Sequence, residues 1–292
     1  MLRFIRQSLS SLYSEREANK LAINVLQHVT NLSQAAILTC KDTVLSENER
    51  QKIEQIVARL QKSEPLEYIL GKTEFYGLSF CVSPDVLIPR PETEELVDWI
   101  IRDTKHPAPR ILDIGTGSGC IAVALAKNIE NSNVFAIDIS ENALEIARKN
   151  AEINNVNVEF FRKDIFKAPS MGGVAAVPPP KSPIEGGFRG DFNIIVSNPP
   201  YVCESEKADI EANVLLYEPH TALFVPNENP LVFYRAIANF ALTHLSGSLY
   251  FEINRAFGQE ICTMLGEMGF SDIELRKDNY GNNRMIKCNS GI

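Results

Sequence analysis

The chain has 292 residues, of which 45% are hydrophobic and 23% are charged, with 16 glycines and 16 prolines. This composition is typical of a globular protein with one large or two unequal domains, and it excludes a fibrous or mostly disordered chain. The formal net charge of −8 argues against a broad surface that binds nucleic-acid phosphates. No apolar run reaches the roughly 20 residues of a membrane-spanning helix, and no secretion signal is recognisable, so we expect a cytoplasmic protein.

The cysteines and histidines give no sign of a metal site. The six cysteines are scattered without a C-x-x-C pair, and the four histidines lie far apart in the sequence. This pattern is typical of a reduced chain with buried thiols rather than a zinc or disulfide protein. The sequence also shows no self-complementary apolar stripe, so we expect a monomer. Because it has no membrane-spanning run and a negative net charge, we expect it to bind neither a membrane nor, stably, a nucleic acid.

Residues 1–72 are predicted to form a small, all-helical N-terminal domain. Apolar residues recur there at three- and four-residue steps, and Ser46 followed three residues later by Glu49 is a capping box that opens a helix. We expect this domain to recognise the substrate; the alternative is that it only stabilises the rest of the chain. Residues 73–92 are predicted to form a short hairpin and a proline-rich linker.

Residues 93–292 are predicted to form an α/β domain. Thr93 is expected to cap a helix that runs to Ile101. Apolar strands then alternate with helices, which is typical of a parallel, doubly wound sheet, and the last two strands are expected to form an antiparallel hairpin at its edge. The predicted strands are Arg110–Ile114, Asn133–Ile137, Val158–Arg162, Asn193–Ser197, Leu249–Ile253, Asp272–Arg276 and Arg284–Cys288. The Gly/Pro-rich insertion 168–190 is expected to be a surface loop without a chemical role.

A glycine-rich turn joins the first strand of this domain to the next helix. Glycines allow a tight turn and a close approach to a ligand, and the start of the helix offers free N–H donors. The third glycine comes one position too early for the G-x-G-x-x-G dinucleotide fingerprint. The pattern resembles instead the S-adenosylmethionine loop of Rossmann-like methyltransferases. The turn reads Asp113, Ile114, Gly115, Thr116, Gly117, Ser118 and Gly119.

Acidic residues also end the next two strands. Asp138 lies nineteen positions after Gly119, where a carboxylate can accept both ribose hydroxyls of a nucleoside. The alternative is that Asp138 only caps the following helix; the glycine turn favours the ribose role. Asp164, Ile165 and Phe166 follow the next strand, where an acid can meet the adenine amino group and apolar side chains can lie against its ring. Taken alone, this triplet fits a loop acid followed by core residues better.

The tetrapeptide Asn198-Pro199-Pro200-Tyr201 directly follows a predicted buried strand. Two prolines can end a strand, but that purpose needs neither Asn nor Tyr. The Asn198 side-chain oxygen and the Pro199 carbonyl can each accept one N–H of a planar NH₂ group, and Tyr201 can pack its ring against the flat target. Two such acceptors orient a weakly nucleophilic nitrogen toward a methyl donor and stabilise its developing charge. The first and fourth strands of a doubly wound sheet are neighbours, so we expect this tetrapeptide and the glycine turn to face one pocket.

Together these motifs resemble the protein-(glutamine-N5) methyltransferases of the HemK/PrmC family, which modify the glutamine of the Gly-Gly-Gln motif in peptide chain release factors. The resemblance covers nearly the whole chain. Besides the two motifs above, it includes Glu64-Pro65-Leu66, Phe75-Tyr76-Gly77, Leu87-Ile88-Pro89-Arg90-Pro91-Glu92-Thr93-Glu94, Tyr217-Glu218-Pro219 and Asp278-Asn279-Tyr280-Gly281.

The resemblance implies a Rossmann-like class I methyltransferase sheet, S-adenosylmethionine as cofactor and a release factor as protein partner. The cofactor would contact the glycine turn from Asp113 to Gly119, the two later acids, Ile165 and Asn198. The glutamine would contact Asn198, Pro199, Pro200 and Tyr201, of which Asn198, Pro199 and Tyr201 would be catalytic, while Arg90 and Thr93 would line the approach between the domains. The sequence departs from the family in the insertion 168–190 and in Ile165, where some relatives carry an aromatic residue.

Three other functions stay open on the sequence alone. A glutamine methyltransferase for a ribosomal protein would share all of this chemistry. A nucleic-acid methyltransferase acting on adenine N6 or guanine N2 would meet the same planar NH₂ group, although the acidic balance counts against it. A scaffold that only binds would need neither Asn198 nor the three loop glycines.

Overall fold

The computed structural model describes residues 1–39, 45–167 and 192–291, and the chain divides into two compact units. The first unit contains Met1–Lys72 together with Ile210–Glu218, and the second contains Thr73–Asp209 and Pro219–Ile292. The sequence pattern did not predict that a segment from the C-terminal half packs with the N-terminal residues. The insertion 168–190 lies outside the described residues. None of the helices within those three described ranges is long and apolar enough to cross a membrane.

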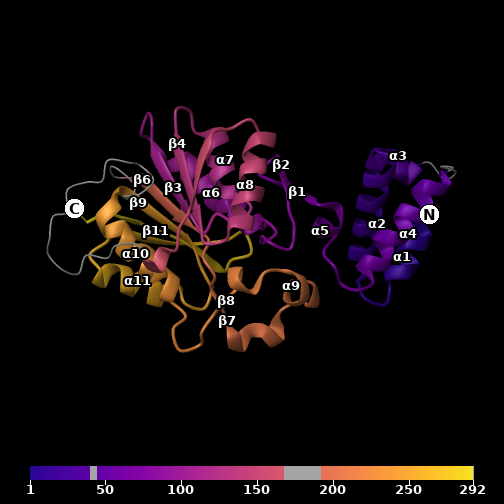
Figure 1. The fold of residues 1–292 in the computed structure, drawn as a ribbon. Coiled ribbons are helices and arrows are strands. Elements are labelled where there is room, and N and C mark those ends of the chain that lie inside the picture. Colours follow the sequence, from indigo (N-terminus) through magenta and orange to yellow (C-terminus); the bar gives the residue numbers. More distant parts are fainter. Residues whose placement is uncertain (40–44, 168–191, 292) are drawn as a thin grey trace. The chain divides into compact units, whose positions relative to one another are not determined.

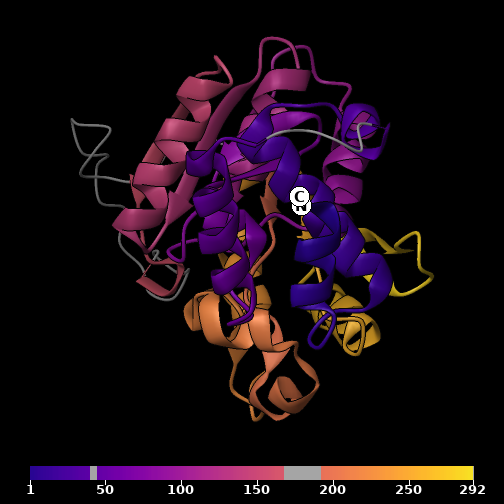
Figure 2. The same cartoon turned by 90° about the vertical axis from the view of Figure 1, so that its right-hand side faces the viewer.

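The first unit is a helical bundle in which α1, α2 and α4 lie side by side, as both views show (Figures 1 and 2). Apolar residues on their facing sides, including Ile5, Val25 and Ile53, form one core. The predicted capping box of Ser46 and Glu49 opens α4. Tyr217 of α9 donates a hydrogen bond to the Lys62 carbonyl at 2.9 Å. The helices are α1 (Leu2–Leu9), α2 (Glu15–Thr30), α3 (Gln34–Thr39), α4 (Glu47–Leu60), α5 (Leu66–Leu70) and α9 (Ala212–Tyr217).

The second unit is built on a seven-stranded sheet with the order β10-β11-β9-β6-β3-β4-β5. The five strands from β9 to β5 in this order run parallel, and β10 and β11 form an antiparallel pair at the other edge. The predicted α/β fold with an edge hairpin is therefore confirmed. The strands are β3 (Arg110–Ile114), β4 (Asn133–Asp138), β5 (Val158–Arg162), β6 (Phe192–Ser197), β9 (Leu245–Glu252), β10 (Ser271–Lys277) and β11 (Asn283–Asn289).

Helices cover both faces of this sheet (Figure 1). Strand β3 shows why, because its successive side chains point to opposite faces: Ile111 packs with α6, α7 and α8, and Leu112 packs with α10 and α11. These helices are α6 (Pro91–Asp103), α7 (Cys120–Asn128), α8 (Glu141–Ile153), α10 (Val232–His244) and α11 (Gly258–Glu267). Smaller elements complete the unit: β1 (Lys72–Phe75) and β2 (Leu78–Cys81), β7 (Val202–Cys203) and β8 (Phe224–Val225), and the 3₁₀ turns η1 (Ile165–Lys167), η2 (Glu204–Asp209) and η3 (His220–Ala222).

A buried asparagine joins the predicted hairpin to the glycine turn. The Asn150 side chain, on α8, accepts a hydrogen bond from the Cys81 N–H at 2.6 Å and donates to the Cys81 carbonyl at 3.0 Å. It also donates to the Ser118 carbonyl at 2.8 Å. Because Asn150 is fully buried, these bonds replace water for three main-chain groups of β2 and the turn.

Thr93 does not cap α6, and this prediction is wrong. The helix begins two residues earlier at Pro91, with Arg90 at the N-cap position. Proline suits the first helical position because its missing N–H would have no partner there. Thr93 therefore lies in the first turn of α6, is 2% exposed, and points its hydroxyl into the interior.

Candidate active site

The turns that follow β3 and β6 meet at a cavity of about 150 Å³. The two strands are adjacent in the sheet, so their carboxyl ends lie side by side. The structure thus brings together the predicted residues Arg90, Thr93, Gly115 to Ser118, Asp138, Asn198 and Pro200, all of which line this cavity. Asp113, Gly119 and Tyr201 are not part of its lining.

The glycine turn has a backbone that few other residues adopt. Gly115, Gly117 and Gly119 have φ values of +74°, +53° and +80°, a region in which a β-carbon is strained. The N–H groups of Gly115 and Thr116 both donate to the Ile137 carbonyl, at 2.9 and 3.0 Å. The turn is therefore fixed to the end of β4 while it exposes backbone to the cavity.

Asp138 is held by backbone donors at the edge of this turn. Its Oδ2 accepts a hydrogen bond from the Gly117 N–H, and its Oδ1 accepts one from the Ser140 N–H, both at 2.9 Å. The cap of α8 is Ser140, whose hydroxyl accepts from the Ala143 N–H. Burial raises the pKa of Asp138, and the backbone donors oppose this shift. The helix has its own cap, so capping does not account for the carboxylate that lines the cavity.

Asp113 is fully buried beneath the turn. The Thr116 hydroxyl donates to its Oδ2 at 2.6 Å, and its Oδ1 has no hydrogen-bond partner within the described part of the chain. Burial raises the pKa of Asp113 to about 7, although the Thr116 hydrogen bond opposes the shift. Asp113 therefore supports the turn from below.

A smaller, mostly apolar cavity of about 70 Å³ adjoins the first and shares Gly115, Asp138 and Pro200 with it. The predicted residues Asp164 and Ile165 line it, together with Pro199. Phe166, which the sequence analysis grouped with Asp164 and Ile165, lines it as well. Phe233, which the sequence analysis missed, also lines this cavity, and its ring centroid lies 5.0 Å from that of Phe166. No sequence signal marks Phe233 on the apolar helix α10.

The predicted tetrapeptide is fixed by hydrogen bonds at both ends. The Ser197 hydroxyl, just before it, donates to the Ile114 carbonyl at 2.6 Å and so ties the end of β6 to β3. The Asn198 Nδ2 donates to the Thr93 hydroxyl at 3.2 Å. The Tyr201 hydroxyl donates to a carboxylate oxygen of Glu252 at 3.0 Å. Burial raises the pKa of Tyr201, and its ring packs partly against the core around α10 rather than lining the cavity.

Glu252 is a further functional candidate that the sequence analysis missed. It ends β9, is 1% exposed, and accepts hydrogen bonds from Thr93 at 2.6 Å and from Tyr201. The signal was present, because an acidic residue interrupts an otherwise apolar predicted strand, where an unpaired charge is costly.

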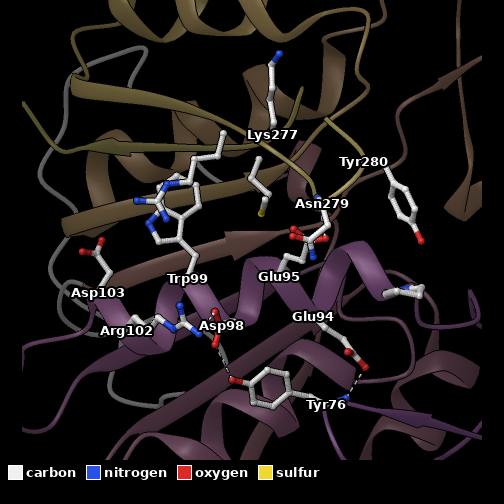
Figure 3. A pocket seen from close by; sticks show the side chains of 13 residues that line it. Tyr76, Glu94, Glu95, Asp98, Trp99, Arg102, Asp103, Lys277, Asn279 and Tyr280 are labelled. Carbon is white, nitrogen blue, oxygen red and sulfur yellow. Dashed lines mark hydrogen bonds and ion pairs between the residues drawn. The ribbon is translucent and has the colours of Figure 1, made fainter. Parts of the chain in front are cut away.

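A cavity of about 810 Å³ lies elsewhere in the second unit, between α6 and the turn that joins β10 and β11 (Figure 3). Its acidic groups already have partners: the Tyr76 hydroxyl donates to Asp98 at 3.3 Å, and the Tyr76 N–H donates to Glu94 at 2.7 Å. The Asn279 N–H donates to Glu95 at 3.2 Å. None of the predicted site residues lines this cavity, so its size alone does not make it the active site.

Comparisons with known proteins bear on the whole chain. Residues 1–71 match the PrmC N-terminal domain, and residues 105–217 match a methyltransferase domain. A release factor glutamine methyltransferase from Bacteroides thetaiotaomicron is 45% identical over 288 residues, which cover 98% of each chain. One from Flavobacterium psychrophilum is 43% identical over 97% of this chain and 95% of its own. The chain belongs to the release factor glutamine methyltransferase family. It is therefore an enzyme, a glutamine methyltransferase, as the sequence resemblance implied.

Solved structures agree with the fold of this glutamine methyltransferase. The catalytic domain of hMettl16, in complex with the MAT2A 3'UTR hairpin 1, superposes with a TM-score of 0.54, covering 85% of this chain and 82% of its own at 16% identity. A methyltransferase from Pyrococcus furiosus superposes with a TM-score of 0.50 over 85% of this chain and 100% of its own, at 21% identity. At this identity the likeness shows the fold alone, and it confirms the predicted Rossmann-like methyltransferase sheet.

Proposed function

We propose that this enzyme transfers a methyl group from S-adenosylmethionine to the side-chain amide nitrogen (N5) of the glutamine in the Gly-Gly-Gln motif of peptide chain release factors. The observation that carries the proposal is that Asn198 lines the same cavity as Gly115 to Ser118. One wall thus offers hydrogen-bond acceptors for an amide, and the other offers a turn suited to a nucleoside cofactor. The names of the relatives supply the substrate, because they are release factor glutamine methyltransferases.

The residues around the two adjoining cavities fit S-adenosylmethionine. A β-carbon on Gly115 or Gly117 would meet no protein atom within 4 Å, so the turn leaves open space for a ligand. The N-terminus of α7, with its partial positive charge, suits the cofactor's carboxylate, and the Asp138 carboxylate suits the ribose hydroxyls. The apolar cavity with Phe233 suits the flat adenine ring. When bound, the cofactor supplies an electrophilic methyl group on a sulfonium sulfur.

In this proposal Asn198 and Pro199 bind and orient the amide nitrogen that receives the methyl group. An amide nitrogen is a weak nucleophile because its lone pair is delocalised into the carbonyl group. The Asn198 side-chain oxygen and the Pro199 backbone oxygen each accept one N–H of the glutamine amide, which fixes the orientation of the nitrogen. The same two oxygens stabilise the positive charge that develops on the nitrogen during transfer. Arg90 and Thr93, on the wall that α6 provides, are proposed to border the entering glutamine.

Release factor is favoured over the other acceptors by the full-length relatives, and the acidic net charge counts against a nucleic acid. A ribosomal-protein glutamine offers the same amide and is the nearest alternative. An RNA amino group offers a similar planar nitrogen, but the resemblance to an RNA-bound methyltransferase structure concerns the fold alone. The N-terminal helical unit is proposed to recognise the release factor.

The test is methyl transfer from labelled S-adenosylmethionine to purified release factor, beside a release factor whose Gly-Gly-Gln glutamine is replaced by alanine. Ribosomal proteins and bare ribosomal RNA are parallel acceptors. We expect label on the unmodified factor alone. Label on a ribosomal protein or on RNA would show that the protein is a methyltransferase with a different substrate.

A variant pair tests the role of Asn198. We expect Asn198→Ala to lower kcat about 10²- to 10³-fold, the usual cost of removing one group that stabilises transition-state charge. Its affinity for S-adenosylmethionine, measured by calorimetry, should stay near that of the unaltered enzyme. Asn128→Ala, in which the replaced amide donates to the Ala124 carbonyl of its own helix, is the matched control. An equal loss of cofactor affinity in Asn198→Ala would show that Asn198 serves the cofactor instead.

A further inference from the structure

A buried chain of hydrogen bonds runs from the candidate active site into the interior of the second unit. Asn198 Nδ2 lies 3.2 Å from the Thr93 hydroxyl oxygen, which lies 2.6 Å from Glu252 Oε2. Three elements contribute: the turn after β6, the first turn of α6, and the end of β9. Only its outer members, Asn198 and Thr93, line the cavity; Glu252 is buried behind them.

The direction of this chain follows from the chemistry of its inner end. An ionised carboxylate only accepts hydrogen bonds, so the single Thr93 hydroxyl proton is directed to Glu252. The Thr93 oxygen is then free only to accept, and the group that Asn198 turns toward it must be the NH₂ end of its amide. The carbonyl oxygen Oδ1 is consequently the end of the Asn198 amide that a ligand in the cavity can meet.

We propose that Glu252 is a positioning residue: acting through the Thr93 hydroxyl, its carboxylate holds the Asn198 amide with Oδ1 available to the substrate. The reversed orientation would present NH₂ to the NH₂ of a glutamine, and two donors facing each other cannot bond. Glu252 thereby sets the site to receive a donor. This inference rests on the proposed transfer to an amide nitrogen.

Three neighbouring groups stabilise a negative charge on Glu252, although the residue is buried. Burial and the nearby charge of Glu92 raise the pKa of Glu252, and the hydrogen bonds from Thr93 and Tyr201 and the positive charge of Arg284 oppose that shift without cancelling it. Arg284 itself is paired with Asp278 at 3.2 Å and is mostly buried. Stability alone does not explain a carboxylate at this buried position, because buried ion networks seldom improve stability over apolar packing.

Two substitutions of Thr93 separate positioning from packing. Thr93→Val keeps the shape of the side chain but removes the hydroxyl, so Asn198 loses the partner that orients it. We expect kcat for release factor to fall about 10- to 100-fold, a typical effect of removing a group that orients a functional residue, with a smaller change in KM. Thr93→Ser, which retains the hydroxyl, should recover most of that loss. Equal rates in the two variants would overturn the inference.

Glu252→Gln supplies the second arm, since it preserves volume and removes the charge. Its amide can donate to Thr93, which would turn the hydroxyl toward Asn198 and reverse the chain. If Glu252 acts through Thr93, the losses in the double variant Glu252→Gln/Thr93→Val are not additive, and kcat stays close to that of Thr93→Val. Additive losses of kcat would show that Glu252 acts independently of Thr93 and would contradict the proposal.

A measurement without substrate keeps this inference apart from the proposed function. The Asn198 side-chain NH₂ protons, assigned in ¹⁵N NMR spectra by their loss in Asn198→Ala, should exchange with water at least about tenfold more slowly in the unaltered enzyme and Thr93→Ser than in Thr93→Val, as expected for protons held in a hydrogen bond. Fast exchange in all three would refute the positioning. Slow exchange together with an enzyme that leaves release factor unlabelled would refute only the proposed substrate.

Discussion

Two glycines of the turn after β3 both have a positive φ but have different surroundings, so alanine substitutions should separate their roles. Gly115 and Gly119 have φ values of +74° and +80°, and a β-carbon in this region costs about 1–2 kcal/mol. A β-carbon on Gly115 would meet no atom within 4 Å. One on Gly119 would lie 3.0 Å from the Ala147 Cβ and 3.2 Å from the Ala147 Cα.

We therefore expect Gly115→Ala to lower the free energy of unfolding by about 1–2 kcal/mol, the backbone strain alone. Gly119→Ala should lower it by about 2–5 kcal/mol, because overpacking against α8 adds about 1–3 kcal/mol. Cofactor binding should show the opposite order. Gly115 lines the cavity and Gly119 does not, so Gly115→Ala should weaken S-adenosylmethionine binding more strongly.

The assay uses a probe that the chain already contains. Trp99 is the only tryptophan, and it is buried on α6 in the second unit. Urea unfolding followed by its fluorescence therefore reports the stability of the second unit alone, and calorimetry measures cofactor affinity. Ala147→Gly is the control, since removing the nearest atom should shrink the extra cost of Gly119→Ala. Equal destabilisation by the two alanines, or a smaller loss for Gly119→Ala, would refute the packing argument.

Three further predictions concern Asp113, Asn150 and Phe233 of the second unit. Burial raises the pKa of Asp113 to about 7, well above its value in the unfolded chain. Between about pH 4 and 7 the native state therefore holds a proton that the unfolded chain has released, and the free energy of unfolding falls as pH rises. Asp113→Asn should remove this pH-dependent loss of about 4 kcal/mol, as measured by urea unfolding at a series of pH values. Asn150→Ala leaves main-chain groups of Cys81 and Ser118 unpaired and should cost about 2–4 kcal/mol, with faster hydrogen exchange at the Cys81 amide; an unchanged exchange rate would contradict the assigned bonds. Phe233→Ala should raise the Kd of S-adenosylmethionine about tenfold by calorimetry, since an aromatic contact contributes about 0.5–1.5 kcal/mol; an unchanged Kd would place the adenine elsewhere.

The sequence predicted the sheet because local and global signals agree there. Apolar runs bounded by glycine or asparagine define strands whose parallel order follows from the intervening helices. In such a sheet the turns after neighbouring strands must meet, so the proximity of Gly115 and Asn198 could be predicted without coordinates.

What the sequence could not predict depends on which side chains meet across the fold. Thr93 looked like a cap because threonine favours that position, but Pro91 opens the helix first and turns Thr93 inward. Glu252 was visible as an acid in an apolar strand, yet its partners lie on α6 and after β6, far away in the sequence. Phe233 is one of several aromatic residues on α10, and only the rotation of the helix about its axis, which packing against the core sets, decides which of them lines the apolar cavity.

The route of the chain through its two units affects how they can be separated. Ile210–Glu218 belongs to the first unit and both of its flanks belong to the second, so the polypeptide crosses from one unit to the other three times. Cutting the chain once, after Lys72, would leave the N-terminal fragment bound through α9. The segment Ile210–Glu218 begins nine residues after Tyr201, and the residue that follows it, Pro219, lines the candidate active-site cavity. A force on the helical unit would therefore be transmitted along the chain to Pro219 at the candidate site as well as to the linker after Lys72.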